Sequence, residues 1–448
     1  MTYHEALSYL YSFFNLEHHA QFSYRRELNL ERMRKLLDWF NHPERQFKSV
    51  LIAGTKGKGS TAFFLHSMLV RNGIQAGLYT SPHLSDFRER FRTNQRFISK
   101  DEIARLVLRI KKTVEKRRPE IRKMEPITFF EISTLLAFLF FAERKINWAV
   151  LEVGMGGRLD ATNAVRQSLS VLTVMGLDHE EHLGRTISKI AGEKAAILKP
   201  NVPFVSARQP KEALQVIRSK AKRTGSRGFF SGAHFNFRIR SELLQSSRFD
   251  FKMGKKKLKN CVIRLPGRFQ VENASAALAA LTVLENELGL SISDERIRRG
   301  LLETNWPGRF EILKRRSGTC ILDGAHNGTS VLALSRALRR FFPDKKVITI
   351  FGTSYGKNLH AILPVLARNS EVLIATQADH PRAQLSKWIA ESARPFFRIV
   401  IPTGDIQEAI RSAERIRDSK TVLLVTGSLF LVGEARAILC NNKRERKQ

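Results

Sequence analysis

The chain has 448 residues, which at roughly 100–200 residues per domain indicates two to four domains. Apolar residues make up 43% and charged residues 26%, a balance that is typical of globular proteins and excludes wholesale disorder. The formal net charge of +34 favours anionic partners, a class that includes nucleotides, acidic metabolites, nucleic acids and anionic surfaces.

The cysteines and the apolar segments bear on the compartment. Cys261, Cys320 and Cys440 are far apart and form no CxxC pair, so neither a disulfide framework nor a zinc knuckle is indicated. The first residues show no basic segment followed by an apolar one, the pattern of a secretory signal. The longest apolar run, 135–142, is far shorter than the ~20 residues of a membrane span. We therefore expect a cytoplasmic protein with no membrane partner.

Helices and strands alternate through the first half of the chain. Helices are predicted over 3–14, 30–40, 61–71, 100–116, 128–144 and 187–198, and strands over 49–53, 76–80, 148–153, 169–174 and 202–206. This order predicts an α/β fold with a mainly parallel sheet. Residues 235–263 instead alternate polar and apolar residues around a basic loop, 252–259, and predict antiparallel strands; a helix is predicted over 273–288.

The strand–helix rhythm restarts after Trp306. Strands are predicted over 320–323, 347–351, 372–375, 398–401 and 422–425, with helices between them. We therefore expect two domains. Residues 1–305 would form a P-loop-type ATPase domain with a mainly parallel sheet, and residues 306–448 a smaller, Rossmann-like α/β domain. Residues 441–448 are expected to be a frayed, charged tail.

The strongest local signal is the glycine-rich turn 54–60, G-T-K-G-K-G-S, between a predicted strand and a predicted helix. Glycines there let backbone N–H groups converge on phosphates, Lys58 adds a positive charge, and the following helix offers its N-terminus to an anion. The usual P-loop spacing G-x-x-x-x-G-K-[ST] is not met, because Ile52 stands where the first glycine would be and Gly59 follows the lysine. We predict a phosphate site, with a tight ligand-free turn as the alternative.

Further polar groups follow the predicted strands. Glu152 comes at the end of a buried strand, where a nucleotide-bound Mg²⁺ finds a ligand. Residues 154–158, G-M-G-G-R, fail the dinucleotide fingerprint because Leu159 replaces its third glycine. His179 lies beyond another strand, at the edge of the sheet where ligands bind. Lys194 follows Glu193 in a helix, where spacing alone favours a solvated charge pair, and 323–327, D-G-A-H-N, forms another strand-to-helix turn.

Taken together, these segments resemble the folylpolyglutamate synthase/dihydrofolate synthase family of the Mur ligase superfamily. The matching motifs are G-T-K-G-K-G-S at 54–60, S-P-H-L at 81–84, E-R-F-R-T-N at 89–94, T-F-F-E at 128–131, E-V-G-M-G-G-R-L-D-A-T-N at 152–163, L-D-H at 177–179, E-K-A at 193–195, P-G-R-F at 266–269 and 307–310, D-G-A-H-N at 323–327, and T-G-S-L-F-L-V-G-E at 426–434. They occur in order and span nearly the whole chain.

The resemblance implies an ATP-dependent amide ligase that uses Mg²⁺. In this family a substrate carboxylate takes the γ-phosphoryl group of ATP, and the amine of L-glutamate then attacks the acyl phosphate. The carboxylate belongs to dihydropteroate or to the terminal glutamate of a reduced folate. Because a carboxylate is a poor electrophile, the protein must position the reactants and neutralise charge.

The family's functional residues carry over to named positions of this chain. Those expected to hold ATP are Gly57, Lys58, Gly59, Ser60, Asn273, Arg309 and Asp323. Ser81, Glu152 and His179 resemble the Mg²⁺ ligands. Lys194 matches the lysine that the family carries as a carbamate, and this match replaces the interpretation of Glu193 and Lys194 as a solvated charge pair. The expected catalytic residues are Lys58, Lys194 and His326. Thr128, Phe130 and Arg158 match positions near the pterin.

Two features depart from the family. Lys56 stands where the family has asparagine in the phosphate turn, and an added cation there either tightens ATP binding or points to solvent. The net charge of +34 exceeds what the chemistry needs; it either steers polyanionic folates or is a basic surface with no specific role.

Two other functions stay open at this point. A cell-wall Mur ligase would act on a UDP-muramoyl substrate, although only 53 residues precede Gly54 and no separate UDP-binding domain is evident. A basic ATP-binding protein acting on nucleic acid is supported by net charge alone, because no RNP-like motif, zinc finger or aromatic-interleaved basic segment occurs. We expect small-molecule partners, no specific nucleic acid, and a monomer, as the family suggests.

Overall fold

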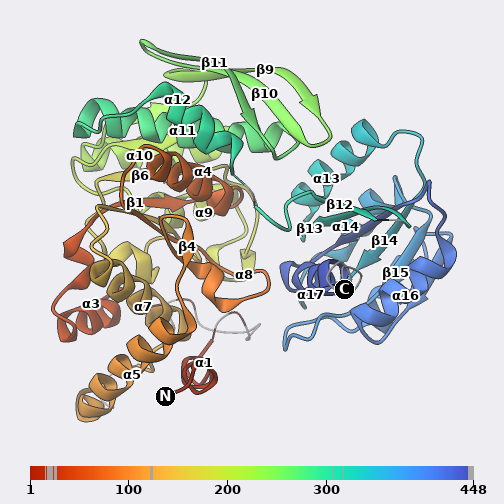
Figure 1. The fold of residues 1–448 in the computed structure, drawn as a ribbon, viewed down its shortest axis with the longest axis horizontal. Coiled ribbons are helices and arrows are strands. Elements are labelled where there is room, and N and C mark those ends of the chain that lie inside the picture. Colours follow the sequence, from red (N-terminus) through yellow and green to blue (C-terminus); the bar gives the residue numbers. More distant parts are fainter. Residues whose placement is uncertain are drawn as a thin grey trace, which may run out of the picture.

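The computed structural model describes residues 1–15, 17, 24, 28–121, 125–304, 306–315 and 317–441. The described residues form sheets of eight, three and six strands. The first two belong to the N-terminal part of the chain and the third to the C-terminal part, which Figure 1 shows set to one side of the rest. A large, mainly parallel sheet and a separate C-terminal α/β unit confirm the predicted fold class.

The eight-stranded sheet has the order β4-β3-β2-β5-β1-β6-β7-β8. Its strands are β1 (Lys48–Ala53), β2 (Ala76–Tyr79), β3 (Phe91–Thr93), β4 (Arg96–Phe97), β5 (Trp148–Glu152), β6 (Leu169–Leu172), β7 (Phe204–Ser206) and β8 (Gly228–Phe230). The β2–β3 and β3–β4 pairs are antiparallel and the others parallel. Strand β5 is buried along its whole length, as expected for parallel strands covered on both faces.

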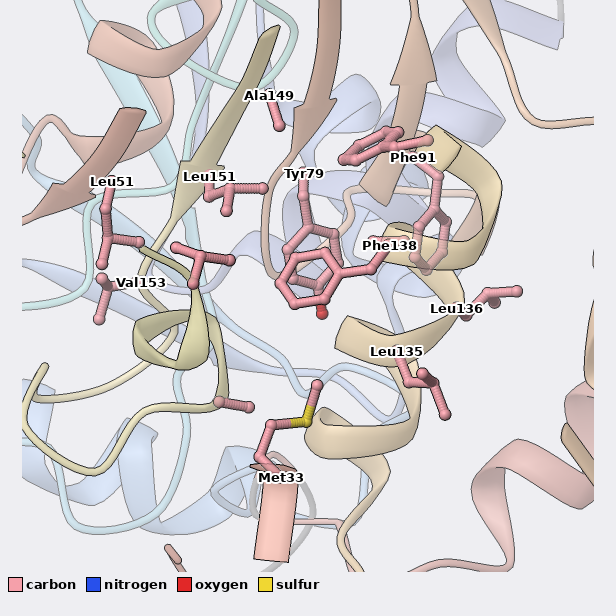
Figure 2. Packing of buried hydrophobic residues seen from close by; sticks show 14 of the residues in the cluster. Met33, Leu51, Tyr79, Phe91, Leu135, Leu136, Phe138, Ala149, Leu151 and Val153 are labelled. Atoms are coloured by element: carbon pink, nitrogen blue, oxygen red, sulfur yellow. The ribbon is translucent and has the colours of Figure 1, made fainter. Parts of the chain in front are cut away.

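Helices cover both faces of this sheet. They are α1 (Tyr3–Tyr11), α3 (Leu30–Trp39), α4 (Lys58–Arg71), α5 (Lys100–Lys116), α6 (Arg118–Ile121), α7 (Phe129–Glu143), α8 (Glu180–Leu183), α9 (Ile187–Ala195), α10 (Lys211–Thr224), α11 (Arg268–Leu288) and α12 (Asp294–Leu302), with short 3₁₀ turns η1 (Pro43–Gln46), η2 (Phe87–Arg90) and η3 (Ala161–Ala164). Figure 2 shows one core, in which Leu51, Tyr79 and Leu151 of the strands meet Phe138 of α7 and Met33 of α3. A second core lies under α4, α11 and α12.

The three-stranded sheet is antiparallel, as predicted. Strands β9 (Phe235–Leu243), β10 (Ser246–Met253) and β11 (Lys256–Ile263) pack against α11. The prediction of a basic loop over residues 252–259 is wrong. Only Gly254 and Lys255 form the turn, because Gly254 takes a left-handed φ of 54° and so allows a two-residue hairpin connection. The remaining basic residues belong to the two strands.

The six-stranded sheet has the order β12-β13-β17-β14-β15-β16. Its strands are β12 (Glu311–Arg315), β13 (Gly318–Asp323), β14 (Val347–Phe351), β15 (Val372–Ala375), β16 (Ile399–Pro402) and β17 (Val422–Thr426); its helices are α13 (Gly328–Phe341), α14 (Leu359–Ala367), α15 (Ser386–Ala393), α16 (Ile406–Ile416) and α17 (Leu429–Asn441). Only β12, which was not predicted, runs antiparallel to its neighbour. Of the predicted tail, Asn441 ends α17 and the rest lies outside the described residues.

Two helices begin earlier than predicted. Helix α4 starts at Lys58 instead of residue 61, and α11 starts at Arg268 instead of residue 273. A glycine with positive φ, Gly57 or Gly267, precedes each, and the start of α4 lies in the segment 54–60 that was predicted to be a turn. In the part of the chain that the structure describes, no helix has the length and apolar composition needed to cross a bilayer.

A buried ion pair fixes the start of α7. Arg32 Nε of α3 donates to both carboxylate oxygens of Glu131, at 2.9 and 2.8 Å. Glu131 also accepts from the Thr128 N–H at 2.8 Å, and the Thr128 hydroxyl caps the helix in return. Burial raises the pKa of Glu131 and the Arg32 charge opposes that rise. The pair therefore holds the first turn of α7, which carries Phe130, in place.

Replacing Glu131 by alanine should lower the free energy of unfolding by about 3–5 kcal/mol, because the buried Arg32 then loses the α7 carboxylate that pairs with it. Urea unfolding followed by circular dichroism measures the loss. The matched control is Glu31→Ala, which removes an exposed pair with Arg34 on the same helix α3 and should cost no more than about 1 kcal/mol. Equal losses of unfolding free energy in the two variants would show that the buried pair stabilises the fold no more than the exposed pair does.

Candidate active site

The phosphate turn joins β1 to α4. Gly57 has a left-handed φ of 84°, and a Cβ placed there would lie 2.1 Å from the Asn273 side-chain oxygen of α11. A Cβ on Gly59 would lie 3.2 Å from a carboxylate oxygen of Glu152. The N-cap residue Gly57 has no side chain to cap α4. The Glu152 carboxylate interacts with the Gly59 N–H, and the other N–H groups of the first turn, including that of Ser60, can bind an anion.

Glu152 ends β5, the neighbour of β1 in the sheet. Its side chain is buried, with 6% of the residue exposed, and it accepts a hydrogen bond from the Ser81 N–H at 3.2 Å. Burial raises the pKa of the Glu152 carboxyl, while the charges of Lys58 and Arg309 lower it. The structure thus brings Ser81, Glu152 and Lys58, which are far apart in the sequence, to one edge of the sheet.

A second charged group follows β6. Asp178 pairs with Lys357 of the C-terminal unit at 3.4 Å. His179 has a left-handed φ of 52°, and burial lowers the pKa of its imidazole to about 3. Lys194 of α9 is 3% exposed; burial, and next the Lys58 charge, lower its pKa to about 7 while Asp178 opposes them. At neutral pH the imidazole is uncharged and about half of the amine is neutral.

The C-terminal unit contributes the turn after β13. Asp323 accepts from the Phe310 and Ala325 N–H groups at 2.8 and 2.9 Å; burial raises the pKa of its carboxyl and Arg309 opposes the rise. His326 Nδ1 lies 2.8 Å from the Gly324 carbonyl and therefore donates to it. Burial lowers the pKa of His326 to about 4, so its Nε2 is an acceptor at neutral pH.

A cavity of about 510 Å³ lies between the two units. Its lining includes Ser81, Phe130, Asp178 and His179 from the N-terminal unit and Asn327, Lys357 and Arg382 from the C-terminal one. Two polar contacts cross from one unit to the other beside this cavity, the Asp178–Lys357 pair and a hydrogen bond from Lys56 Nζ to the Asn327 side chain; others cross elsewhere, as between Arg340 and Glu242. Burial lowers the pKa of Lys56 to about 8. Lys56 therefore points across the cleft rather than into solvent.

The predicted substrate residues are not equivalent. Phe130 lines the cavity, and a Cβ on Gly154 would lie 2.6 Å from its ring. Thr128 is fully buried and caps α7. Arg158 forms an ion pair with Glu193 at 3.0 Å and does not belong to the cavity lining. Only Phe130 is thus placed to touch a molecule in the cavity.

Seven charged residues of the cavity lining were not among the predicted site residues, and three of them follow parallel strands. Asp178 precedes His179 in one motif, and Lys357 and Arg382 follow β14 and β15. The rule that ligands bind at the carboxyl ends of parallel strands is a signal that points to all three. The predicted residues Lys58, Glu152, Asn273, Arg309, Asp323 and His326 surround the junction of the two units without lining this cavity.

The comparisons with known proteins agree with this arrangement. The Mur ligase middle domain family matches residues 52–281 and the Mur ligase glutamate ligase domain family matches 308–429. The chain is 35% identical over 421 residues to a dihydrofolate synthase/folylpolyglutamate synthase of Bacillus subtilis, covering 93% of this chain and 96% of that protein. It belongs to the folylpolyglutamate synthase/dihydrofolate synthase family of Mur-type ligases.

Solved structures of this family have the same fold. A folylpolyglutamate synthase of Thermotoga maritima is 35% identical, with a TM-score of 0.84 over 98% of this chain and 97% of that chain. A bifunctional folylpolyglutamate synthase/dihydrofolate synthase, solved with Mn, AMPPNP and L-glutamate bound, is 27% identical, with a TM-score of 0.83 over 98% of both chains. These relatives confirm the resemblance and do not support the UDP-muramoyl alternative. The nucleic-acid hypothesis keeps no support beyond net charge.

Substituting Gly57 by alanine should lower the free energy of unfolding by about 1–3 kcal/mol, because the new Cβ would collide with Asn273 in a backbone conformation that already disfavours a side chain. The control is Gly254→Ala, which also has positive φ but has no atom within 4 Å. Chemical denaturation compares the two. If Gly57→Ala lowers the free energy of unfolding no more than Gly254→Ala does, steric contact with Asn273 does not constrain the turn.

Proposed function

We propose that the protein is an ATP-dependent ligase that joins L-glutamate to dihydropteroate, to reduced folates, or to both, through an acyl phosphate. The observation that carries this proposal is the convergence of an uncapped helix N-terminus, at Lys58, with Glu152 on one side and Arg309 and Asp323 of the other unit. The names of its relatives, and the AMPPNP and L-glutamate bound in one of them, support the same reaction.

Each step requires charge to be neutralised. An oxygen of the substrate carboxylate attacks the γ-phosphorus of ATP, and ADP leaves. The amine of L-glutamate then attacks the acyl carbon, loses a proton, and phosphate leaves with the bonding electrons. We assign the triphosphate to the N–H groups of Gly57, Gly59 and Ser60 and to the Lys58 ammonium. The remaining nucleotide contacts fall to Asn273, Arg309 and Asp323.

The proposed Mg²⁺ ligands are Ser81, Glu152 and His179. Among the described residues no three His, Cys, Asp or Glu side chains gather as a metal cage. A buried carboxylate beside the phosphate turn nevertheless fits Mg²⁺, which is usually held by one or two carboxylates, substrate phosphates and water. When bound there, the ion would neutralise charge on the phosphates. His179, neutral at pH 7, can offer a ring nitrogen.

Lys194 and His326 are assigned to the second step. We propose that Lys194 carries a carbamate, because its neutral amine can attack CO₂ and the resulting anion would offset the Lys58 charge that acts on it. His326 Nε2 is an acceptor at neutral pH, and we propose that it orients the incoming amine. Phe130 is proposed to contact the pterin ring, with Thr128 holding the turn that carries it. Arg158 is proposed to act at a distance, through its partner Glu193.

We also propose a division into domains 1–305 and 306–448 that close on the nucleotide, since Arg309 and Asp323 come from beyond the junction. The two contacts that cross the cleft, at Lys56 and at Lys357, support closure. The three cysteines are unpaired, which supports a reducing, cytoplasmic location. We also propose that the protein acts as a monomer, as the family resemblance suggests.

Incubating the protein with Mg-ATP, L-glutamate and either dihydropteroate or tetrahydrofolate should release phosphate and add one glutamate mass to at least one acceptor. Lys58→Ala should lower the rate by about 100-fold or more, because a cation aimed at the transferring phosphoryl group is lost. Lys112→Ala, an exposed lysine of α5, should not change it. Phosphate release and product mass are followed together.

Product in only one tube would tell dihydrofolate synthase from folylpolyglutamate synthase, and product in both would indicate a bifunctional enzyme. No phosphate release and no product with either acceptor, while the protein is folded, would refute the proposed reaction.

Carbamate formation at Lys194 should increase with pH. The lowered pKa, about 7, means that the reactive neutral amine is the minor form at pH 6 and the major form at pH 8. At fixed dissolved ¹³CO₂, the ¹³C carbamate signal should therefore grow between these pH values, and Lys194→Arg should lack it. A carbamate signal of equal size in Lys194→Arg would place the modification elsewhere.

A further inference from the structure

A second cavity, of about 500 Å³, lies on the other side of Pro82 from the first, and Pro82 is the residue that both linings share. Its walls come from α4, from β3 and β4, from the junction at Trp306 and Pro307, and from Arg436 of α17. It is therefore built from both units. Apart from Arg309, none of the residues assigned to the ligase reaction lines it.

The distinctive residue of this cavity is Arg92 of β3. Its guanidinium carbon lies 4.8 Å from the ring centre of Phe63 and 4.4 Å from that of Phe97. Contacts of this kind use the flat faces of a guanidinium and leave its in-plane N–H groups for hydrogen bonds. Those N–H groups form the planar fork that binds a carboxylate or phosphate through two parallel bonds.

Within the described part of the chain, Arg92 has no partner for these donors. Its Nε is buried without a hydrogen bond, and no carboxylate lies within ion-pair distance. Burial lowers the pKa of Arg92, and Glu89 opposes this from a distance. The Glu89 carboxylate is already used, because it accepts the backbone N–H groups of Leu84 and Asp86 at 2.7 and 3.1 Å.

The neighbouring arginines differ from Arg92. Arg71 is paired with Glu303, and Arg436 Nε donates to both oxygens of Glu311 at 2.9 Å. Their charges are compensated within the protein, whereas that of Arg92 is not. An unpaired cation in a partly buried cavity is unfavourable unless an anion joins it.

Aromatic and apolar side chains form part of the remaining wall, beside polar ones such as Thr80, Asn94 and Gln95. Trp306 lies with its ring centre 4.7 Å from that of Phe63, and 41% of Phe97 is exposed although it is a large apolar side chain. Cavities of 300–1,000 Å³ with apolar walls and a few placed polar groups are typical of small-molecule sites.

We propose that this cavity is a second ligand site, for a small molecule in which a flat ring carries a carboxylate or phosphate, with the anion on Arg92 and the ring against Trp306. Adenine nucleotides and pteroylglutamates share this chemistry. The assignment rests on this cavity alone and does not depend on the proposed reaction.

An occupant would connect the two units. A Cβ on Gly433 of α17 would lie 1.8 Å from the Leu84 carbonyl, so the helix and the turn that bound the cavity touch directly. Pro82 also follows Ser81, whose N–H binds Glu152. A ligand in the second cavity therefore acts on the closure of the cleft and on the edge of the phosphate site.

Isothermal titration with adenosine monophosphate and, separately, with pteroylglutamate tests the site. At least one probe should bind with one ligand per chain in an event that weakens tenfold or more in Arg92→Gln and in Phe97→Ala. The event should persist in Lys58→Ala, which changes the phosphate turn. The matched control is Arg96→Gln, a residue of β4 that pairs with Glu102 at 3.1 Å and is absent from the lining; it should leave the event unchanged.

The probes distinguish the sources of the ligand. An Arg92-dependent event with adenosine monophosphate alone identifies a nucleotide site, and one with pteroylglutamate alone a folate site; both outcomes support the proposal. If Arg92→Gln fails to fold, Phe97→Ala, at an exposed position, decides instead. Binding of both probes with unchanged affinity in the folded variants, or no binding of either probe, would overturn it.

Discussion

The structure depends on cations held close together at the carboxyl edge of β1, β5 and β6. Burial lowers the pKa of Lys56 and Lys194, and the Lys58 charge adds to the effect at Lys194. The carboxylates nearby are few and mostly engaged, as Glu152 is with the Ser81 N–H. Such an arrangement is costly while it is empty, because like charges repel strongly in a medium of low dielectric constant. We propose that a polyphosphate bound there relieves this repulsion, which then contributes to the binding free energy.

The same shortage of nearby counter-charges explains the contacts across the cleft. Lys357 reaches Asp178 and Lys56 reaches Asn327, so each half supplies a polar partner that the other half lacks. These contacts hold the units together without a nucleotide, and they involve the residues nearest to the cavity. A substrate entering between the units must compete with them, which couples binding to the relative position of the two sheets.

Much of the fold could be predicted, and the failures have physical causes. The alternation of buried strands and helices was sufficient for the central strands of both parallel sheets, because parallel strands with two covered faces read as continuous apolar runs; the strands β3, β4, β8 and β12 were missed. The start of α4 at Lys58 was not predicted, because the glycine-rich segment 54–60 resembles a loop. The basic segment 252–259 looked like a loop because charge obscured a regular alternation in β10 and β11.

The site was predictable where a motif joins a strand end, as at Glu152 and His179. It was less so for contacts between units, since nothing in the sequence shows that Lys357 faces Asp178 or that Arg92 lies between aromatic rings. Thr128 shows what the motif alone does not reveal: its side chain caps α7, whereas the ring of Phe130, two positions later, lines the cavity.

The crowding around the phosphate turn restricts how this enzyme can vary. Gly57 has no room for a side chain, because Asn273 stands directly against it, and a Cβ on Gly59 would be tight against Trp306 and Glu152. Position 56 is different: its side chain extends across the cleft to Asn327. Differences in nucleotide binding among related ligases should therefore concentrate at this position. A longer or shorter side chain there changes the contact between the units and leaves the backbone of the phosphate turn unchanged.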